Sequence, residues 1–271
     1  MTDANDATIA AATTQDRRPD PQVRAATVAD IGEALAEGLR DFQAAPLYGL
    51  FFGGVYALGG VAMALAATAW GMIYLVYPLA AGFALIGPFV AVGLYEVSRR
   101  REKGEPLGWG PVLGVVFAQS RRELGWMAFV TLFIFMMWMY QVRLLIALFF
   151  GFQSFTPDEL LRILLTTPEG WLFLGIGHLV GAILSVILYS VTVVSFPLLL
   201  DREVDFITAM ITSVRAVTMS PGPMLGWAAI VVAVLLVSCA PMFLGLFVAL
   251  PILGHTTWRL YRRLIVEAPA A

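Results

Sequence analysis

The two histidines are the first residues of this sequence that could do chemistry, because imidazole binds metals and haem and transfers protons. His178 lies inside one long apolar segment, and His255 lies near the end of another, four residues before Arg259. If both segments cross a membrane, helix geometry places His178 about two turns from the outer end and His255 about one turn from the inner end. The two side chains are then expected near opposite faces of the bilayer. The sequence therefore predicts no metal site and no cofactor, and polar contact between helices is the expected role of each histidine.

Three charged residues complete the set of candidate functional residues. Glu96, Asp201 and Arg202 each follow an apolar segment and stand beside other charged residues. Carboxylates that relay protons through a membrane lie deeper than this, which counts against ion-coupled transport. The sequence contains no GxSxG, no HExxH and no glycine-rich phosphate loop. We therefore predict a protein that is not an enzyme and has no catalytic residue.

Composition indicates lipid as the solvent for most of the chain. Of 271 residues, 59% are hydrophobic and only 13% are charged, and the mean hydropathy is +0.82, whereas soluble domains are about 25% charged. The net charge of −2 offers no basic face for nucleic acid. Cys239 is the only cysteine, so no internal disulfide is possible.

The apolar segments predict an all-α, polytopic membrane protein. Six transmembrane helices are expected in three hairpins, within a domain over residues 29–264. Residues 1–28 are expected to form a disordered cytoplasmic tail, with a short tail at residues 265–271. The six expected spans cover about residues 47–70, 73–97, 125–150, 171–200, 224–239 and 241–258.

Short amphipathic segments are expected between these hairpins, on the cytoplasmic side. They cover residues 29–42, 107–122 and 203–217, and each precedes a pair of spans, which suggests three repeats of a short helix and a hairpin. Asp30 is the expected N-cap of the first. These segments are expected either to lie on the inner leaflet or to pack under the bundle as a collar.

Arginine asymmetry sets the expected orientation. The apolar run that begins at Tyr77 stops at Arg99, Arg100 and Arg101. With six spans, all of the 17 basic residues except Arg143 and Arg162 fall on the side that holds both termini. The positive-inside rule then predicts that both termini are cytoplasmic.

Three stretches resemble a bacterial family of uncharacterised predicted integral membrane proteins, some of which carry the label of a cytochrome c oxidase subunit. They are Gly82–Glu96, Ser195–Arg202 and Leu253–Arg262. The resemblance implies a bacterial inner-membrane protein, and the label, together with close-packing glycines and the absence of acidic residues from the middle of the expected spans, favours a non-enzymatic accessory or assembly subunit of a respiratory complex. Its expected partners are the lipid bilayer and other membrane subunits. The alternative is a small transporter or channel built from three hairpins, because prolines interrupt the second and fourth spans.

Overall fold

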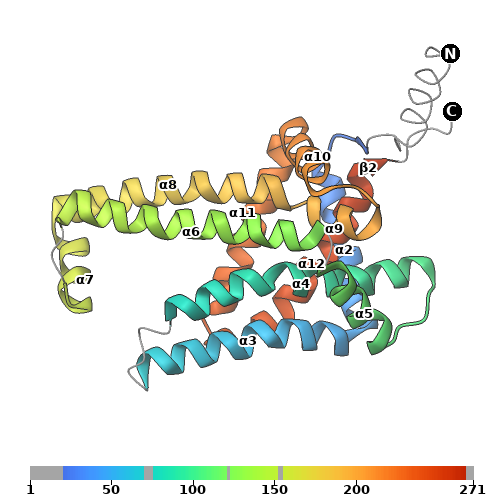
Figure 1. Ribbon diagram of the computed structural model, residues 1–271, viewed down its shortest axis with the longest axis horizontal. Helices are drawn as coiled ribbons and strands as arrows, with labels where there is room; N and C mark the ends of the chain where they lie inside the picture. The colour runs from blue at the N-terminus through green and yellow to red at the C-terminus, as the bar shows by residue number, and fades with distance from the viewer. Residues whose placement is uncertain (1–20, 70–75, 121–122, 152–154, 267–271) are drawn as a thin grey trace, which may run out of the picture.

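The computed structural model describes residues 21–69, 76–120, 123–151 and 155–266. Within them it contains eleven α-helices and one pair of short antiparallel strands. Most of the long helices run along the long axis of the molecule (Figure 1). One end carries α2 (Val28–Ala44), α5 (Trp109–Ser120), α9 (Ser195–Asp201) and α10 (Phe206–Met219), and we call it the arginine-rich end. The short helix α7 (Pro157–Thr166) lies at the opposite end.

Three helices at the arginine-rich end, α2, α5 and α10, each precede a pair of longer helices in the chain. This order agrees with the expected alternation of a short segment and a pair of apolar helices. The first group is α2 (Val28–Ala44), α3 (Pro46–Thr68) and α4 (Val76–Lys103). The second is α5 (Trp109–Ser120), α6 (Glu123–Phe150) and α8 (Pro168–Thr192), with α7 (Pro157–Thr166) between the long helices and α9 (Ser195–Asp201) after them. The third is α10 (Phe206–Met219), α11 (Pro221–Cys239) and α12 (Leu246–Leu264).

Among the described residues, four helical segments are long and apolar enough to cross a membrane. They match the first, third, fourth and fifth expected spans and are Pro46–Ala66, Glu123–Phe150, Pro168–Asp201 and Pro221–Cys239. The expected second span, residues 73–97, begins outside the described residues and continues along α4, which extends into the charged run ending at Lys103. The expected sixth span, residues 241–258, overlaps α12, which begins later because Met242 and Phe243 form a turn at φ 54° and 66°.

The fourth span contains a break near Pro197, in agreement with the expected interruption of this span by a proline. α8 ends at Thr192, and α9 begins at Ser195. Pro197 lacks an N–H and its ring would clash with the carbonyl of Val193, four residues before it. The Val194 N–H is instead satisfied by the Ser213 hydroxyl of α10 at 3.1 Å. This hydrogen bond at the break therefore joins the fourth span to α10.

The two ends of the described chain meet. β1 (Gln22–Val23) pairs with β2 (Ile265–Val266) in antiparallel register. The ordered fold thus begins before residue 29, where we expected a disordered tail to end, and residues 1–20 lie outside the described residues. The N-cap of α2 is Thr27, not Asp30, because Asp30 occupies the third helical position of a capping box.

One face of the amphipathic helix α2 packs against α12. A Cβ added to Gly38 would lie only 2.6 Å from the Thr256 backbone nitrogen, so the two backbones are in close approach. Trp258, Tyr261 and Leu264 of α12 are almost fully buried in the core at this end. The face of α2 that is buried against protein carries Ile31, Ala34 and Gly38, whereas Leu35 and Leu39 are exposed.

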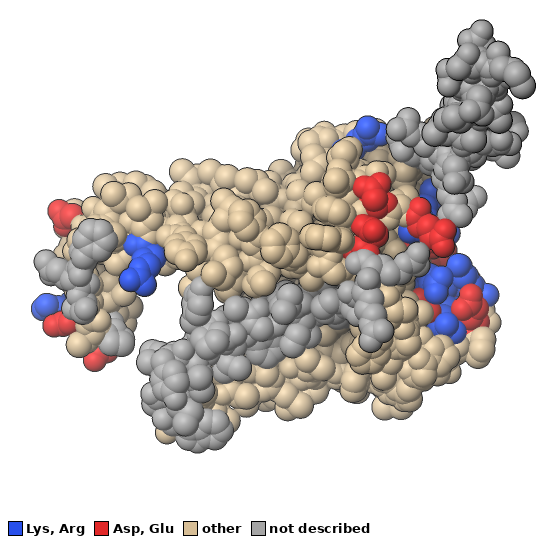
Figure 2. All heavy atoms as spheres, in the orientation of Figure 1, with Lys and Arg blue, Asp and Glu red and all other residues tan. Residues whose placement is uncertain are grey.

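Charged side chains are concentrated at the two ends of the molecule. Figure 2 shows basic and acidic groups together at the arginine-rich end, a smaller group at the end that carries α7, and none between them on the atoms coloured in this view. An uncharged middle between two charged ends is the pattern expected when the long axis crosses a bilayer.

Candidate functional site: a buried polar network at the arginine-rich end

Asp41 is the centre of a buried ionic network. Its side chain is 3% exposed and lies in the last turn of α2, where the helix dipole disfavours negative charge. Arg259 donates to it from Nε at 2.8 Å and from Nη2 at 2.9 Å, and Arg101 donates from Nε at 3.0 Å. Burial would raise the pKa of the Asp41 carboxyl, but these hydrogen bonds and the charge of Arg259 hold that pKa below its usual value. The carboxylate thus links α2, α4 and α12 through charge.

Ser98 connects this carboxylate to His255. The Ser98 hydroxyl donates to Asp41 Oδ2 at 2.8 Å, and its oxygen lies 2.8 Å from His255 Nδ1. If the hydroxyl proton faces the carboxylate, the imidazole must donate from Nδ1. His255 Nε2 is buried and makes no hydrogen bond of ordinary geometry within the described residues, although the ring also interacts with the Leu94 carbonyl.

The trio of Asp41, Ser98 and His255 has the residue types of a hydrolase triad but a different order. In such a triad the imidazole stands between the nucleophile and the carboxylate, whereas here the serine stands in the middle. Ser98 and His255 are both fully buried, so a substrate could not reach the hydroxyl without separating α4 from α12. The arrangement is suited to holding helices together.

A second branch of the network joins α4, α9 and α12. Glu102 accepts from Trp258 Nε1 at 3.1 Å and from Arg262 Nε at 2.9 Å. Arg262 also donates to Asp201 at 3.1 Å, and the Tyr261 hydroxyl donates to the same carboxylate at 2.8 Å. Asp201 therefore fixes the end of the fourth span to the last helix.

Glu96 is fully buried, and its partners come from its own helix. Arg99 donates two hydrogen bonds to it, at 2.7 and 3.0 Å, and Arg100 donates one at 2.6 Å. Its charge is matched locally, in the last turns of α4.

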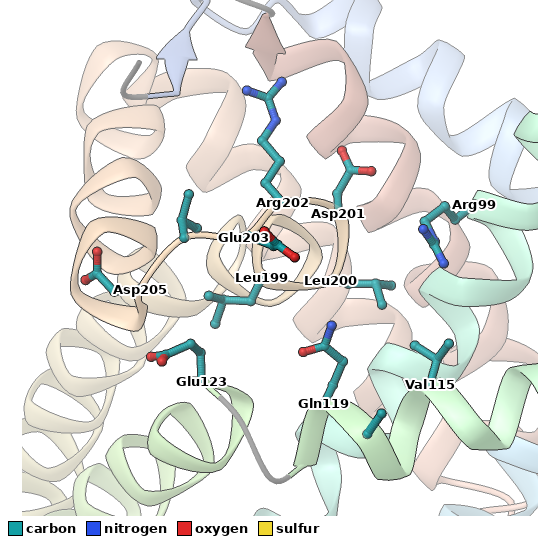
Figure 3. Close-up of a pocket in the computed structure, with 12 residues that line it drawn as sticks. Arg99, Val115, Gln119, Glu123, Leu199, Leu200, Asp201, Arg202, Glu203 and Asp205 are labelled. Carbon is teal, nitrogen blue, oxygen red and sulfur yellow. The ribbon is translucent and has the colours of Figure 1, made fainter. Parts of the chain in front are cut away.

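A polar cavity of about 430 Å³ opens beside the network, between α4, α5 and the segment from α9 to α10. Gln119 and Glu123 lie on one side of this space, below the end of α9, while Arg202 points to the opposite side (Figure 3). Glu123 also accepts from the Phe206 N–H at 3.1 Å and Asp205 caps α10 through Thr208. Several charged groups that line the cavity are thus already engaged in holding α10.

The structure separates the two histidines, as expected. His255 is buried in the network, whereas His178 is exposed on α8, and its Nδ1 lies 2.7 Å from the Leu174 carbonyl oxygen. His178 lines a mostly apolar groove of about 350 Å³ between α6 and α8. Of the other candidates, Asp201 belongs to the network, Glu96 lies one turn away from it along α4, and Arg202 borders the polar cavity.

Sequence reasoning missed the central residues of this network. Apolar periodicity in residues 29–42 places Asp41 on the polar face of an amphipathic helix, and Ser98, Arg101 and Glu102 stand only as polar residues after an apolar run. One signal was present: an acidic residue in the last turn of a helix needs a cationic partner, and the arginines after the second and sixth spans could supply it.

Comparison with known families supports the membrane assignment. Residues 76–201 match the model of a family described as predicted integral membrane protein (DUF2189). This match confirms the resemblance to a family of uncharacterised membrane proteins. No curated protein and no solved structure matches the chain.

Proposed function

We propose that this integral membrane protein is a non-enzymatic accessory or assembly subunit that binds another protein within the bacterial inner membrane. The orientation we propose has six spans and both termini in the cytoplasm, with α4 and α12 as the second and sixth spans. The arginine-rich end then lies at the cytoplasmic face.

The observation that carries the proposal is the exposure of the α6–α8 pair. Only 6% of the most apolar part of α6 is buried, and large side chains such as Phe133 and Leu148 face outward. The groove beside this pair contains Gln141 and His178, two polar side chains expected at membrane depth. Lipid tails cannot satisfy such groups, whereas a neighbouring helix can.

The network at the arginine-rich end supports a structural role for the remainder of the bundle. Asp41, Asp201 and Glu102 pair with arginines and tie the helix ends together. The α6–α8 pair extends away from the arginine-rich end, where this network joins the helices. The transporter alternative receives less support, because apolar side chains such as Trp227, Met127 and Leu198 fill the described core.

The test is site-specific photo-crosslinking in living cells. A benzophenone amino acid is placed at Phe133 or Ile183 on the α6–α8 pair and, as a matched control, at Leu58, an exposed position of α3. We expect a discrete crosslinked protein from the first two positions and none from Leu58. Mass spectrometry of that product identifies the partner, and oxidase subunits would identify the complex as respiratory.

Two outcomes would contradict the proposal. Either no protein product forms at Phe133 and Ile183, or all three positions give the same set of products. Purification of a lone monomer under several mild detergents would point in the same direction.

A further inference from the structure

An apolar cavity of about 280 Å³ lies between α3, α4, α11 and α12. Its lining residues on α4 and α12 recur at spacings of three and four, so the cavity follows the helix axes. It is therefore elongated along the direction in which the helices cross the membrane. The lining residues are Tyr56, Gly87, Val90, Ala91, Leu94, Tyr95, Val231, Leu235, Leu250, Leu253, Gly254 and Thr257.

Tyr95 is the polar group of this cavity that lacks a partner. Its side chain is 6% exposed, and its hydroxyl makes no hydrogen bond with any described residue. The hydroxyl is not among the fully buried polar atoms that lack a partner in the described structure, and Tyr95 is one of the residues that line the cavity. By contrast, the Tyr189 hydroxyl donates to the Met224 carbonyl at 2.7 Å. A buried hydroxyl without a partner is unfavourable unless a ligand accepts a hydrogen bond from it.

The position of Tyr95 indicates which end of a ligand it would meet. It lies one turn before Arg99, on the side of the cavity nearest the arginine-rich end. Gly87, at the other end of the α4 lining, is eight residues away, or about 12 Å along the helix axis. The cavity thus presents the Tyr95 hydroxyl near the membrane surface and mostly apolar walls below it, with the Tyr56 hydroxyl beside Gly87 at the far end.

We propose that this cavity binds a single acyl chain whose carbonyl oxygen accepts a hydrogen bond from the Tyr95 hydroxyl. The chain extends from Tyr95 toward Gly87, between the apolar side chains of α4, α11 and α12. The carbonyl belongs either to the ester of a phospholipid or to a free fatty acid, which share this chemistry. The proposal does not depend on a protein partner, because the site lies between helices of this chain.

The test uses two photoactivatable probes with the same diazirine-bearing palmitoyl chain. One is the free fatty acid, and the other is a phosphatidylethanolamine that carries the chain as an ester. The full-length protein is reconstituted with each probe, irradiated and digested, and the labelled residues are mapped by mass spectrometry. We expect labelling concentrated at Val90, Ala91, Val231 and Leu235, and the more efficient probe identifies the source of the chain.

Three variants make the result specific. Tyr95→Phe removes one oxygen atom, and we expect about a fivefold loss of labelling in the cavity, as for the loss of one hydrogen bond. Ala91→Phe and Leu235→Trp fill the cavity, and we expect a loss of tenfold or more. Tyr140→Phe, at an exposed position of α6, is the matched control and should label as the native protein does.

The proposal fails if the probes label the exposed face of α6 as densely as the cavity. It also fails if Tyr95→Phe labels like Tyr140→Phe. Size-exclusion profiles and thermal unfolding verify the fold of each variant. If both filling variants misfold, Tyr95→Phe decides the question, because it leaves the ring and its packing unchanged.

Discussion

Asp41 and Arg259 form a two-pronged ion pair across 218 positions of the chain. Nε of the guanidinium donates to one carboxylate oxygen at 2.8 Å and Nη2 to the other at 2.9 Å. This geometry is the strongest form of arginine–carboxylate contact. It joins the first helix of the described fold to the last one, at the end where β1 and β2 also pair.

Replacing Asp41 by Asn should destabilise the protein strongly. The change leaves Arg259 and Arg101 partly buried without their carboxylate, which typically costs about 3–5 kcal/mol. Thermal unfolding in mild detergent measures the loss. Asp158→Asn, at an exposed position of α7, is the control and should change stability by less than about 0.5 kcal/mol. An Asp41→Asn variant as stable as this control would show that the network contributes little.

The close approach of α2 and α12 predicts opposite outcomes for two glycines of the same helix. In Gly38→Ala, the new Cβ would lie 2.6 Å from the Thr256 backbone nitrogen, and backbone cannot move aside cheaply, so we expect a loss of about 1–3 kcal/mol. In Gly32→Ala, nothing lies within 4 Å of the new Cβ, and alanine should stabilise the helix by up to about 1 kcal/mol. Equal effects of the two substitutions on thermal unfolding would contradict this packing.

Stability should fall in acid through Asp30. Burial would raise its pKa, but hydrogen bonds from Thr27 and Arg24 lower it from 3.8 to about 2. Because the folded-state pKa is the lower one, the stabilisation is complete above about pH 4 and disappears as the pH falls toward 2. Arg24 is 45% exposed, so solvent screening reduces the effect to about 1 kcal/mol.

The measurement for Asp30 is the difference in unfolding free energy between the native protein and Asp30→Asn, followed from pH 6 to pH 2. We expect this difference to shrink as the pH falls, because the native carboxylate becomes protonated. A difference that is constant over this range would show that Asp30 does not titrate with folding.

The native thiol provides a further check of the arrangement. Cys239 ends α11 and is partly exposed, and in the proposed orientation it lies toward the periplasmic face. A membrane-impermeant maleimide added to spheroplasts should label it, and Cys239→Ser should abolish the label. Labelling only in inverted vesicles would contradict the orientation.

Hydropathy was sufficient to predict the helical membrane class and four of the expected spans, because each is a long apolar run with few charges. Local capping signals were sufficient only in part: Thr156 and Glu159 form a capping box at the start of α7, but the N-cap of α2 is Thr27 and not the expected Asp30. These features depend on residues that are close together in the sequence, so the sequence alone is enough to predict them.

The polar network could not be predicted in the same way, because its contacts are distant in sequence. Ser98 and His255 are 157 positions apart, and each alone resembles an ordinary polar residue near a helix end. A proline break in the fourth span was expected from Pro197, but the hydrogen bond from Val194 to the Ser213 hydroxyl of another helix was not. Such features depend on how the helices pack, which the pattern of apolar residues does not determine.

The central claim is that the arginine-bearing ends of the helices all lie in the cytoplasm. Fusions to compartment reporters test this claim most directly. Alkaline phosphatase and a fluorescent protein are fused in separate strains after Lys103, after Glu203 and after Val266. The account predicts fluorescence without phosphatase activity at all three positions. The contrary result is phosphatase activity after one of these positions and fluorescence after the others. It would place the ends of α4, α9 and α12 in different compartments. Both the six-span arrangement and the single network that joins these ends would then be wrong.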